Sequence, residues 1–114
     1  MPGQARHLRA VASARFQVRI TVPRRGGVIP WLRASADFER RLAGQQDPRV
    51  AGPAIESESR RGRDFVAVKI LMTVDAVDVA QALTVAWGAF QGAAGDDLAG
   101  WDLGSARAEV QPEP

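Results

Sequence analysis

Two segments rich in arginine and glycine carry the residues best suited to chemistry in this chain of 114 residues. Guanidinium groups bind phosphates and carboxylates through paired hydrogen bonds, and glycines that precede a helix leave backbone N–H groups free to bind an anion. Neither the GxGxxG pattern nor a phosphate-binding loop ending in Gly-Lys is present, and Pro30 removes one N–H donor. The candidate anion-binding residues are Arg24, Arg25, Gly26, Gly27, Arg60, Arg61 and Arg63.

The composition disfavours several kinds of catalytic and metal site. The chain contains no cysteine, asparagine or tyrosine, and its single histidine is His7. Thiolate metal sites, cysteine nucleophiles and a Ser-His-Asp triad are therefore not expected. Asp96, Asp97 and Asp102 offer oxygen ligands, but their spacing fits an acidic loop after a helix better than a magnesium site. We expect no catalytic residue, no metal and no cofactor.

Positive and negative charges are concentrated in different halves of the chain. The formal net charge is +2, yet residues 1–63 carry a net +8 and residues 64–114 a net −6. Such asymmetry fits a polyanion partner, and it fits equally well a fold in which the two halves neutralise each other.

The first half of the chain predicts a strand and then a helix. Phe16, Val18, Ile20 and Val22 alternate with polar residues, which indicates a half-buried strand that Pro23 ends. Helical spacing follows over 28–43, with the left-handed stop at Gly44. The apolar stripe of this helix contains Val28, Trp31, Leu32, Ser35, Phe38 and Leu42.

The second half predicts two strands, a helix and a last strand. A weak strand over 53–59 precedes a strong one over 64–74, and alternation over 106–110 marks the last. Asp75 and Asp78 together resemble a capping box, which predicts a helix over 76–94. Its buried stripe contains Val79, Ala82, Leu83, Ala86, Trp87, Phe90 and Ala93. Residues 1–14 are expected to be a flexible basic arm, 15–111 a single domain and 112–114 a tail, because QPEP is ill suited to extend a sheet.

This order of elements gives a four-stranded antiparallel sheet, with spatial order 4-1-3-2 and both helices on one face. Across residues 15–111 the chain therefore resembles the ferredoxin-like split βαβ superfold, an α+β two-layer sandwich. Its alanine content and its preference for arginine over lysine look like those of small uncharacterised ferredoxin-like proteins from bacteria with GC-rich genomes. The topology places both arginine-rich segments at one end, near Asp96, Asp97 and Asp102.

The strong strand over 64–74 predicts self-association. It reads DFVAVKILMTV, so one face is wholly apolar and the other is apolar at three of five positions. A strand that is apolar on both faces usually has both faces covered by other elements or by another chain. We expect a homodimer that buries the face formed by Phe65, Ala67, Lys69 and Leu71.

Taken together, these features predict a cytoplasmic, non-catalytic, self-associating binding or scaffold module. No apolar run reaches the roughly 18 residues that a membrane helix needs, so no membrane partner is expected. One alternative is the binding of a polyanion, either a phosphate or a nucleic acid, through the arginine cluster. Another is a cofactor-free enzyme with an apolar cleft between helices and sheet, beside Trp31 and Phe90.

Overall fold

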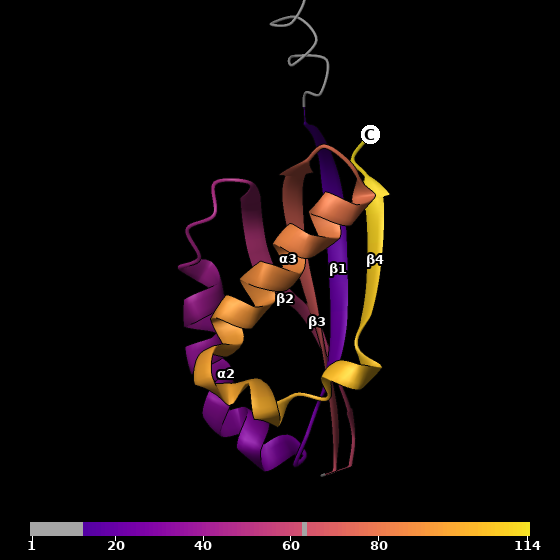
Figure 1. Ribbon diagram of the computed structural model, residues 1–114. Coiled ribbons are helices and arrows are strands. Elements are labelled where there is room, and N and C mark those ends of the chain that lie inside the picture. Colours follow the sequence, from indigo (N-terminus) through magenta and orange to yellow (C-terminus); the bar gives the residue numbers. More distant parts are fainter. Residues whose placement is uncertain (1–12, 63) are drawn as a thin grey trace, which may run out of the picture.

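Alternating apolar residues build a four-stranded antiparallel sheet in the computed structural model, which describes residues 13–62 and 64–114. The strands lie in the spatial order β2-β3-β1-β4, and two helices cover one face (Figure 1). This arrangement confirms the predicted ferredoxin-like fold. The elements, in chain order, are β1 (Ala14–Arg24), α2 (Val28–Ala43), β2 (Val50–Arg61), β3 (Phe65–Ala76), α3 (Val79–Ala94) and β4 (Arg107–Pro112).

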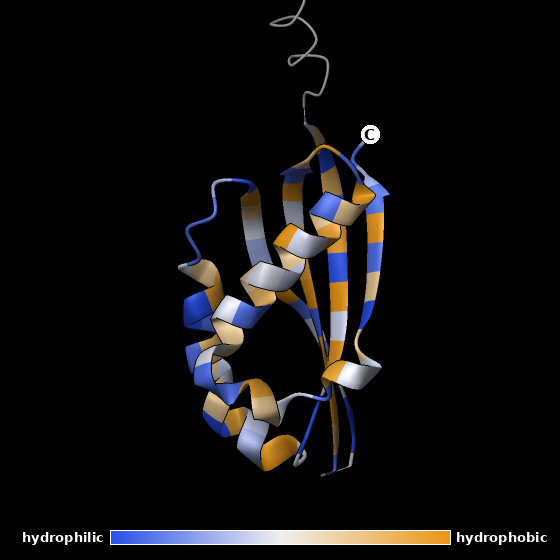
Figure 2. Ribbon diagram, in the orientation of Figure 1, coloured by the Kyte–Doolittle hydropathy of each residue, from blue (hydrophilic) through white to orange (hydrophobic). Residues whose placement is uncertain are grey.

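The two central strands, β1 and β3, supply the floor of the core. Their register places Val18 opposite Met72 and Ile20 opposite Ile70, and all four side chains are buried beneath the helices. Figure 2 shows the resulting alternation of hydrophobic and hydrophilic residues along the strands. The sheet therefore has a helix face, which is largely apolar, and an open face, which neither α2 nor α3 covers.

Four aromatic rings fill the space between the helices and the sheet. Trp101 lies 5.2 Å from Trp31, 5.0 Å from Phe38 and 5.0 Å from Phe90, measured between ring centroids. Trp31 and Phe90 are fully buried, and the indole Nε1 of Trp31 donates a hydrogen bond of 2.8 Å to Glu58 Oε1. Side chains thus occupy the region where the sequence suggested an apolar cleft.

Helix α2 has the predicted bounds, but its buried stripe is narrower than predicted, and Gly44 ends it with a φ of −90°, not with the predicted left-handed conformation. Gly26 and Gly27 have φ angles of 79° and 81°, which a residue with a side chain rarely adopts, and they turn the chain from β1 into α2. Trp31, Phe38 and Leu42 are buried, whereas Leu32 is 55% exposed.

Helix α3 starts three residues later than the capping-box pattern predicts. Asp78 is the N-cap, and its carboxylate accepts a hydrogen bond of 2.8 Å from the N–H of Gln81. Asp75 and Ala76 instead belong to β3, because Ala76 pairs with Ala14 and prolongs the sheet. The prediction that Val79 and Leu83 are buried was also wrong, since they are 50% and 37% exposed.

The chain after α3 crosses to the edge of the sheet through two short 3-10 helices, η1 (Gly95–Gly100) and η2 (Leu103–Ser105). Strand β4 then continues through Pro112, so the first two residues of QPEP do extend the sheet, contrary to prediction. The N–H of Glu113 donates to Arg15 O at 2.9 Å, which turns the nitrogen of Pro112 away from β1.

Most of the predicted N-terminal arm, residues 1–12, lies outside the described residues, and β1 begins at Ala14. In the part of the chain that the structure does describe, no helix is both long enough and apolar enough to span a bilayer.

Candidate anion-binding site

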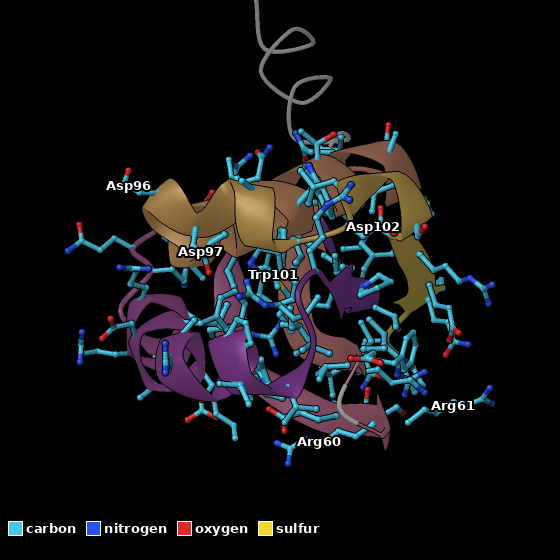
Figure 3. The ribbon with its side chains drawn as sticks, turned by 90° about the horizontal axis from the view of Figure 1, so that it is seen from below. Arg60, Arg61, Asp96, Asp97, Trp101 and Asp102 are labelled. Atoms are coloured by element: carbon cyan, nitrogen blue, oxygen red, sulfur yellow. The ribbon has the colours of Figure 1, made fainter. Side chains whose placement is uncertain are left out.

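The predicted arginine-rich and acidic segments meet at one end of the domain. Figure 3 views this end from below, with Trp101 near the centre, Asp97 and Asp102 beside it, and Arg60 and Arg61 at the β2–β3 turn. Backbone hydrogen bonds hold the end of β1 to the segment after α3: the N–H of Arg25 donates to Gly100 O at 2.7 Å and that of Asp102 to Pro23 O at 2.8 Å.

At this end the open face of the sheet is hollowed into a basin with a volume of about 960 Å³. We call it the open-face basin. Residues from all four strands, from the turn after β1 and from the η1–β4 segment line it. They are Thr21, Pro23, Arg24, Arg25, Gly26, Ser59, Arg61, Asp64, Phe65, Ala67, Lys69, Asp102, Ser105 and Arg107.

The strand register explains why the surface is hollow here. Lys69 on β3 pairs with Thr21 on β1, and Thr21 pairs with Arg107 on β4, so a row of side chains crosses the sheet. In the next row Ala67 pairs with Pro23 on one side and Ser59 on the other. Small residues therefore form the floor, while long basic side chains rise around it.

The basin carries more positive than negative charge. Its cations on the open face are Arg25, Arg61, Lys69 and Arg107, and its acids are Asp64 and Asp102. Arg25 is paired with Asp102, with 3.5 Å between Nη2 and Oδ1. Within residues 13–62 and 64–114, Arg61, Lys69 and Arg107 have no ion-pair partner.

The rest of the open face, in contrast, is neutralised within the chain. Arg19 donates to Glu56 at 2.6 Å from Nε and 3.0 Å from Nη2, and to Glu109 at 3.0 Å from Nη1. The hydrogen bonds from Arg19 hold the pKa of Glu56 below its usual value, with a smaller contribution from the charge of Lys69, and Glu56 and Glu109 raise the pKa of Arg19. Further along the face, Arg15 pairs with Asp75 at 3.3 Å.

The side chains of two of the predicted anion-binding arginines lie on the helix side of the sheet. Arg24 faces the helices, with its Nη1 2.8 Å from Asp97 Oδ2 and its guanidinium 4.8 Å from the ring centroid of Trp101. Arg60 also lies on the helix side of the sheet and pairs with Glu58 at 2.8 Å. Arg25, Gly26 and Arg61 line the basin, and so does Arg24, although its guanidinium is paired with Asp97.

The other two residues of the predicted anion-binding set are Gly27 and Arg63. Gly27 is buried and is the N-cap residue of α2. Arg63 lies outside the described residues.

Three of the four residues predicted to mediate self-association lie in the same basin. Phe65 is 39% exposed, Ala67 is buried and Lys69 is half-buried. Leu71, the fourth, lies between the strands that carry Arg19 and Glu56, so their ion pair spans it. Of the apolar residues that suggested pairing, Phe65 is thus exposed, whereas Ala67 is buried and Leu71 is half-buried, and the homodimer stays a prediction.

Sequence reasoning missed Arg107, Thr21 and the hydroxyls of Ser59 and Ser105. The alternation of β4 put Arg107 on the face opposite Ala108, but only the pairing of Thr21 with Arg107 brings this cation beside Lys69. In the sequence, Arg107 lies in the acidic second half of the chain, so nothing there marks it as part of a basic cluster.

The three aspartates after α3 point in different directions. Asp97 pairs with Arg24, Asp102 pairs with Arg25, and Asp96 lies at the periphery in Figure 3. Among the described residues no group of three or more histidine, cysteine or acidic side chains is placed to hold a metal ion.

Comparison with known proteins found no relative: no family model matches the sequence, and no match was found among curated proteins or among solved structures.

Proposed function

We propose that this chain is a non-catalytic binding module that takes a phosphate-bearing polyanion in the open-face basin. The observation that carries the proposal is the set formed by Arg61, Lys69 and Arg107, three cations around one hollow with no ion-pair partner among the described residues. Elsewhere on this face the arginines are matched by carboxylates. The bacterial source and cytoplasmic location that the composition suggests belong to the same proposal.

The spacing of the cations favours a ligand with several phosphates. Lys69 and Arg107 lie on β3 and β4, with β1 between them, so their backbones are about 10 Å apart. Arg61 extends the set to the far edge of the sheet on β2. Charges spread in this way match a chain of phosphates better than a single ion held at one point.

Phe65 favours a ligand that also carries aromatic rings. It is the one large apolar side chain of the basin that is exposed, and its register partner is the unpaired cation Arg61. A base stacked on an exposed aromatic ring contributes about 1–3 kcal/mol to binding. The combination supports single-stranded nucleic acid as the ligand, held without readout of its sequence.

A dimer formed through the open face would compete with this function. Phe65, Ala67 and Lys69 line the basin, so a second copy seated on them would occupy the space of the ligand. Ligand binding and open-face pairing therefore exclude each other in one molecule. A ligand that dissociates a dimer would indicate that both use the open face.

The proposal can be tested with a fluorescent single-stranded oligonucleotide, by measuring anisotropy over a range of salt concentrations. Arg61→Gln, Lys69→Gln and Arg107→Gln should each weaken binding, and each should reduce the slope of log Kd against log salt by about 0.7 per lost phosphate contact. Arg33→Gln is the matched control, because it removes one exposed arginine from α2, on the opposite layer. An equal effect of Arg33→Gln would reject the basin as the site.

Inorganic polyphosphate and a Phe65→Leu variant distinguish the two parts of the proposal. Loss of the ring should raise the Kd of the oligonucleotide but leave the dissociation constant of polyphosphate, measured by competition, unchanged. Only a base stacks on an aromatic ring. If both ligands are affected equally, Phe65 shapes the basin and does not act as a stacking platform.

A further inference from the structure

The outward side of α3 is an apolar surface that nothing in the described chain covers. The helix has no charged residue in sixteen, although the chain as a whole contains 28 charged side chains. Val79 and Leu83 are exposed, and so is Val77 just before the helix. Figure 2 shows most of α3 in white to orange. We call this surface the α3 outer face; it consists of Val79, Ala80, Leu83, Thr84, Trp87, Gly88, Gln91 and Gly92.

Two glycines within the helix pack against no neighbour in the part of the chain that the structure describes. A Cβ atom added at Gly88 or at Gly92 would meet no atom within 4 Å, so neither glycine makes room for a neighbour. Glycine in the middle of a helix is less favourable than alanine. Together with Ala80 and Thr84 these glycines form a row of small residues at intervals of four, which lie on one side of a helix. Close approach of another backbone would account for them.

Hollows flank this row on both sides. One, of about 810 Å³, separates α3 from the turn that leads into β2, and the other, of about 570 Å³, separates α3 from the η2–β4 segment. Thr84 and Gly88 line both hollows, so the row is the ridge between them. Leu83 and Trp87 border the second hollow, together with Leu103.

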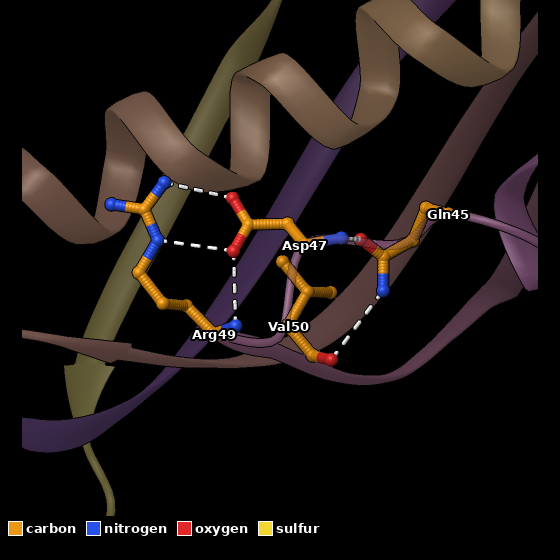
Figure 4. Close-up of polar contacts among 4 residues, drawn as sticks. All are labelled: Gln45, Asp47, Arg49 and Val50. Atoms are coloured by element: carbon orange, nitrogen blue, oxygen red, sulfur yellow. Dashed lines mark hydrogen bonds and ion pairs between the residues drawn. The ribbon is translucent and has the colours of Figure 1, made fainter.

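The turn that walls the larger hollow is neutralised and braced by its own residues (Figure 4). Arg49 donates to Asp47 from its backbone N–H and Nε, both at 3.0 Å, and from Nη2 at 2.8 Å. Gln45 accepts from the N–H of Asp47 at 2.9 Å. A partner entering the hollow therefore meets a fixed wall whose charges are already paired.

We propose that the α3 outer face is the site at which two copies of this chain pair, with their α3 helices antiparallel across a twofold axis. If the axis passes between Thr84 and Gly88, each Thr84 faces Gly88 of the second copy and each Ala80 faces its Gly92. The row of small residues is then complementary to itself. Leu83 and Trp87 of each helix lie beside the hollows of the other.

Charge supports a second copy as the occupant. The face carries no charge, so no like charges meet at the axis. In the antiparallel arrangement Asp78 of one copy comes level with Ala94 of the other. Arg41 lies at that end of α3, with its Nη1 3.4 Å from Ala93 O. An acidic group at each helix start thus meets a basic group at each helix end, which also suits the helix dipoles.

This pairing is separate from the proposed function. The α3 outer face lies on the helix layer and the open-face basin on the other side of the sheet, so the dimer leaves Arg61 and Lys69 free. Arg107, on the edge strand, lines both the basin and the smaller hollow, so Arg61→Gln and Lys69→Gln are the variants that separate the two proposals. Failure of the dimer would not affect ligand binding, and failure of ligand binding would not affect the dimer.

Sedimentation equilibrium of the full chain tests the proposal, with Gly88→Leu as the disrupting variant. We expect a dimer whose Kd rises at least tenfold in Gly88→Leu. Ala36→Leu, which places the same side chain at an exposed position of α2, should leave the Kd unchanged. A wild-type chain that stays monomeric at high micromolar concentration would overturn the proposal, and so would a dimer that Gly88→Leu leaves intact.

Cross-linking gives an independent measurement, because the chain contains no cysteine of its own. Chains with Thr84→Cys mixed with chains with Gly88→Cys should form disulfide-linked pairs faster than either variant alone, since the two positions face each other only across the axis. Equal rates in the mixed and unmixed samples would overturn the antiparallel arrangement.

Discussion

Arg24, the last residue of β1, donates a hydrogen bond of 2.8 Å from Nη1 to Asp97 Oδ2 in η1, across 73 residues of sequence. The side chain of Arg24 is only 2% exposed, whereas that of Asp97 is 44% exposed. The guanidinium also lies 5.3 Å from the ring centroid of Trp31. The pair therefore joins the end of the sheet, the aromatic cluster and the exit from α3, and Asp97 is the counterion of a buried cation.

Asp97→Ala should destabilise the fold, because it leaves the guanidinium of Arg24 buried without its carboxylate. We expect the free energy of unfolding, measured with urea, to fall by about 1–3 kcal/mol. Asp96→Ala is the control: it removes the same charge from the neighbouring position, which is exposed and has no ion pair among the described residues. Equal losses in the two variants would mean that the Arg24–Asp97 pair contributes nothing specific.

Gly100→Ala should destabilise the same region by crowding. A Cβ at Gly100 would lie 2.6 Å from Arg24 Nη1 and 2.6 Å from Asp97 Oδ1, so the ion pair would have to move. Such overpacking costs about 1–3 kcal/mol. At Gly104 the nearest atom to an added Cβ is 3.7 Å away, so Gly104→Ala should be close to neutral in the same unfolding experiment. If Gly100→Ala leaves the free energy of unfolding unchanged, the side chain of Arg24 can adopt another conformation without loss of stability.

The position of Arg24 shows where sequence reasoning about this fold stops. The alternation from Phe16 to Val22 predicted the strand and its buried face, but proline was expected to end it. Strand β1 in fact continues through Pro23 to Arg24. Proline is tolerated because β4 begins only at Arg107, opposite Thr21, so at Pro23 one side of β1 has no neighbouring strand. The extra residues turn the side chain of Arg24 to the helix face, where it pairs with Asp97.

The hydrophobic periodicity likewise predicted the helices and strands better than it predicted which side chains of different strands lie side by side. The sheet order and both helices follow from the patterns, whereas the basin depends on which rows of four separate strands lie side by side. Lys69 and Arg107 are 38 positions apart in sequence, and each is unremarkable there. Helical spacing alone also placed Val79 and Leu83 in the core, because a helix with no charged face gives no signal of which side faces out.

The start of α3 gives a prediction that separates the expected cap from the observed one. Asp78→Ala removes the acceptor of the Gln81 N–H and should lower the free energy of unfolding by about 1 kcal/mol. Asp75→Ala removes only the 3.3 Å contact with Arg15 on the open face, and exposed ion pairs contribute little. Thermal unfolding followed by circular dichroism compares the two variants. A larger loss for Asp75→Ala would restore the capping box predicted from the sequence.

Glu56 should make the stability of the fold depend on acid pH. Hydrogen bonds from Arg19 lower its pKa in the folded chain, from a usual value of 4.5. A carboxylate whose pKa is lower when folded stabilises the fold above its unfolded pKa, and this contribution is lost as the pH falls through the folded pKa. Glu56→Gln should therefore be less stable than wild type at neutral pH, and the difference should shrink as the pH falls below 4.5.

Glu39→Gln isolates this effect from the general loss of a negative charge, since Glu39 is exposed on α2 and makes no ion pair among the described residues. Urea unfolding of the three proteins across the acid range gives the comparison. The wild-type and Glu39→Gln curves should run parallel, while the Glu56→Gln curve approaches them as the pH falls. Added salt should weaken the effect of Glu56, because the pair lies on the open face. A Glu56→Gln curve parallel to wild type at every pH would mean that Arg19 is held by Glu109 alone.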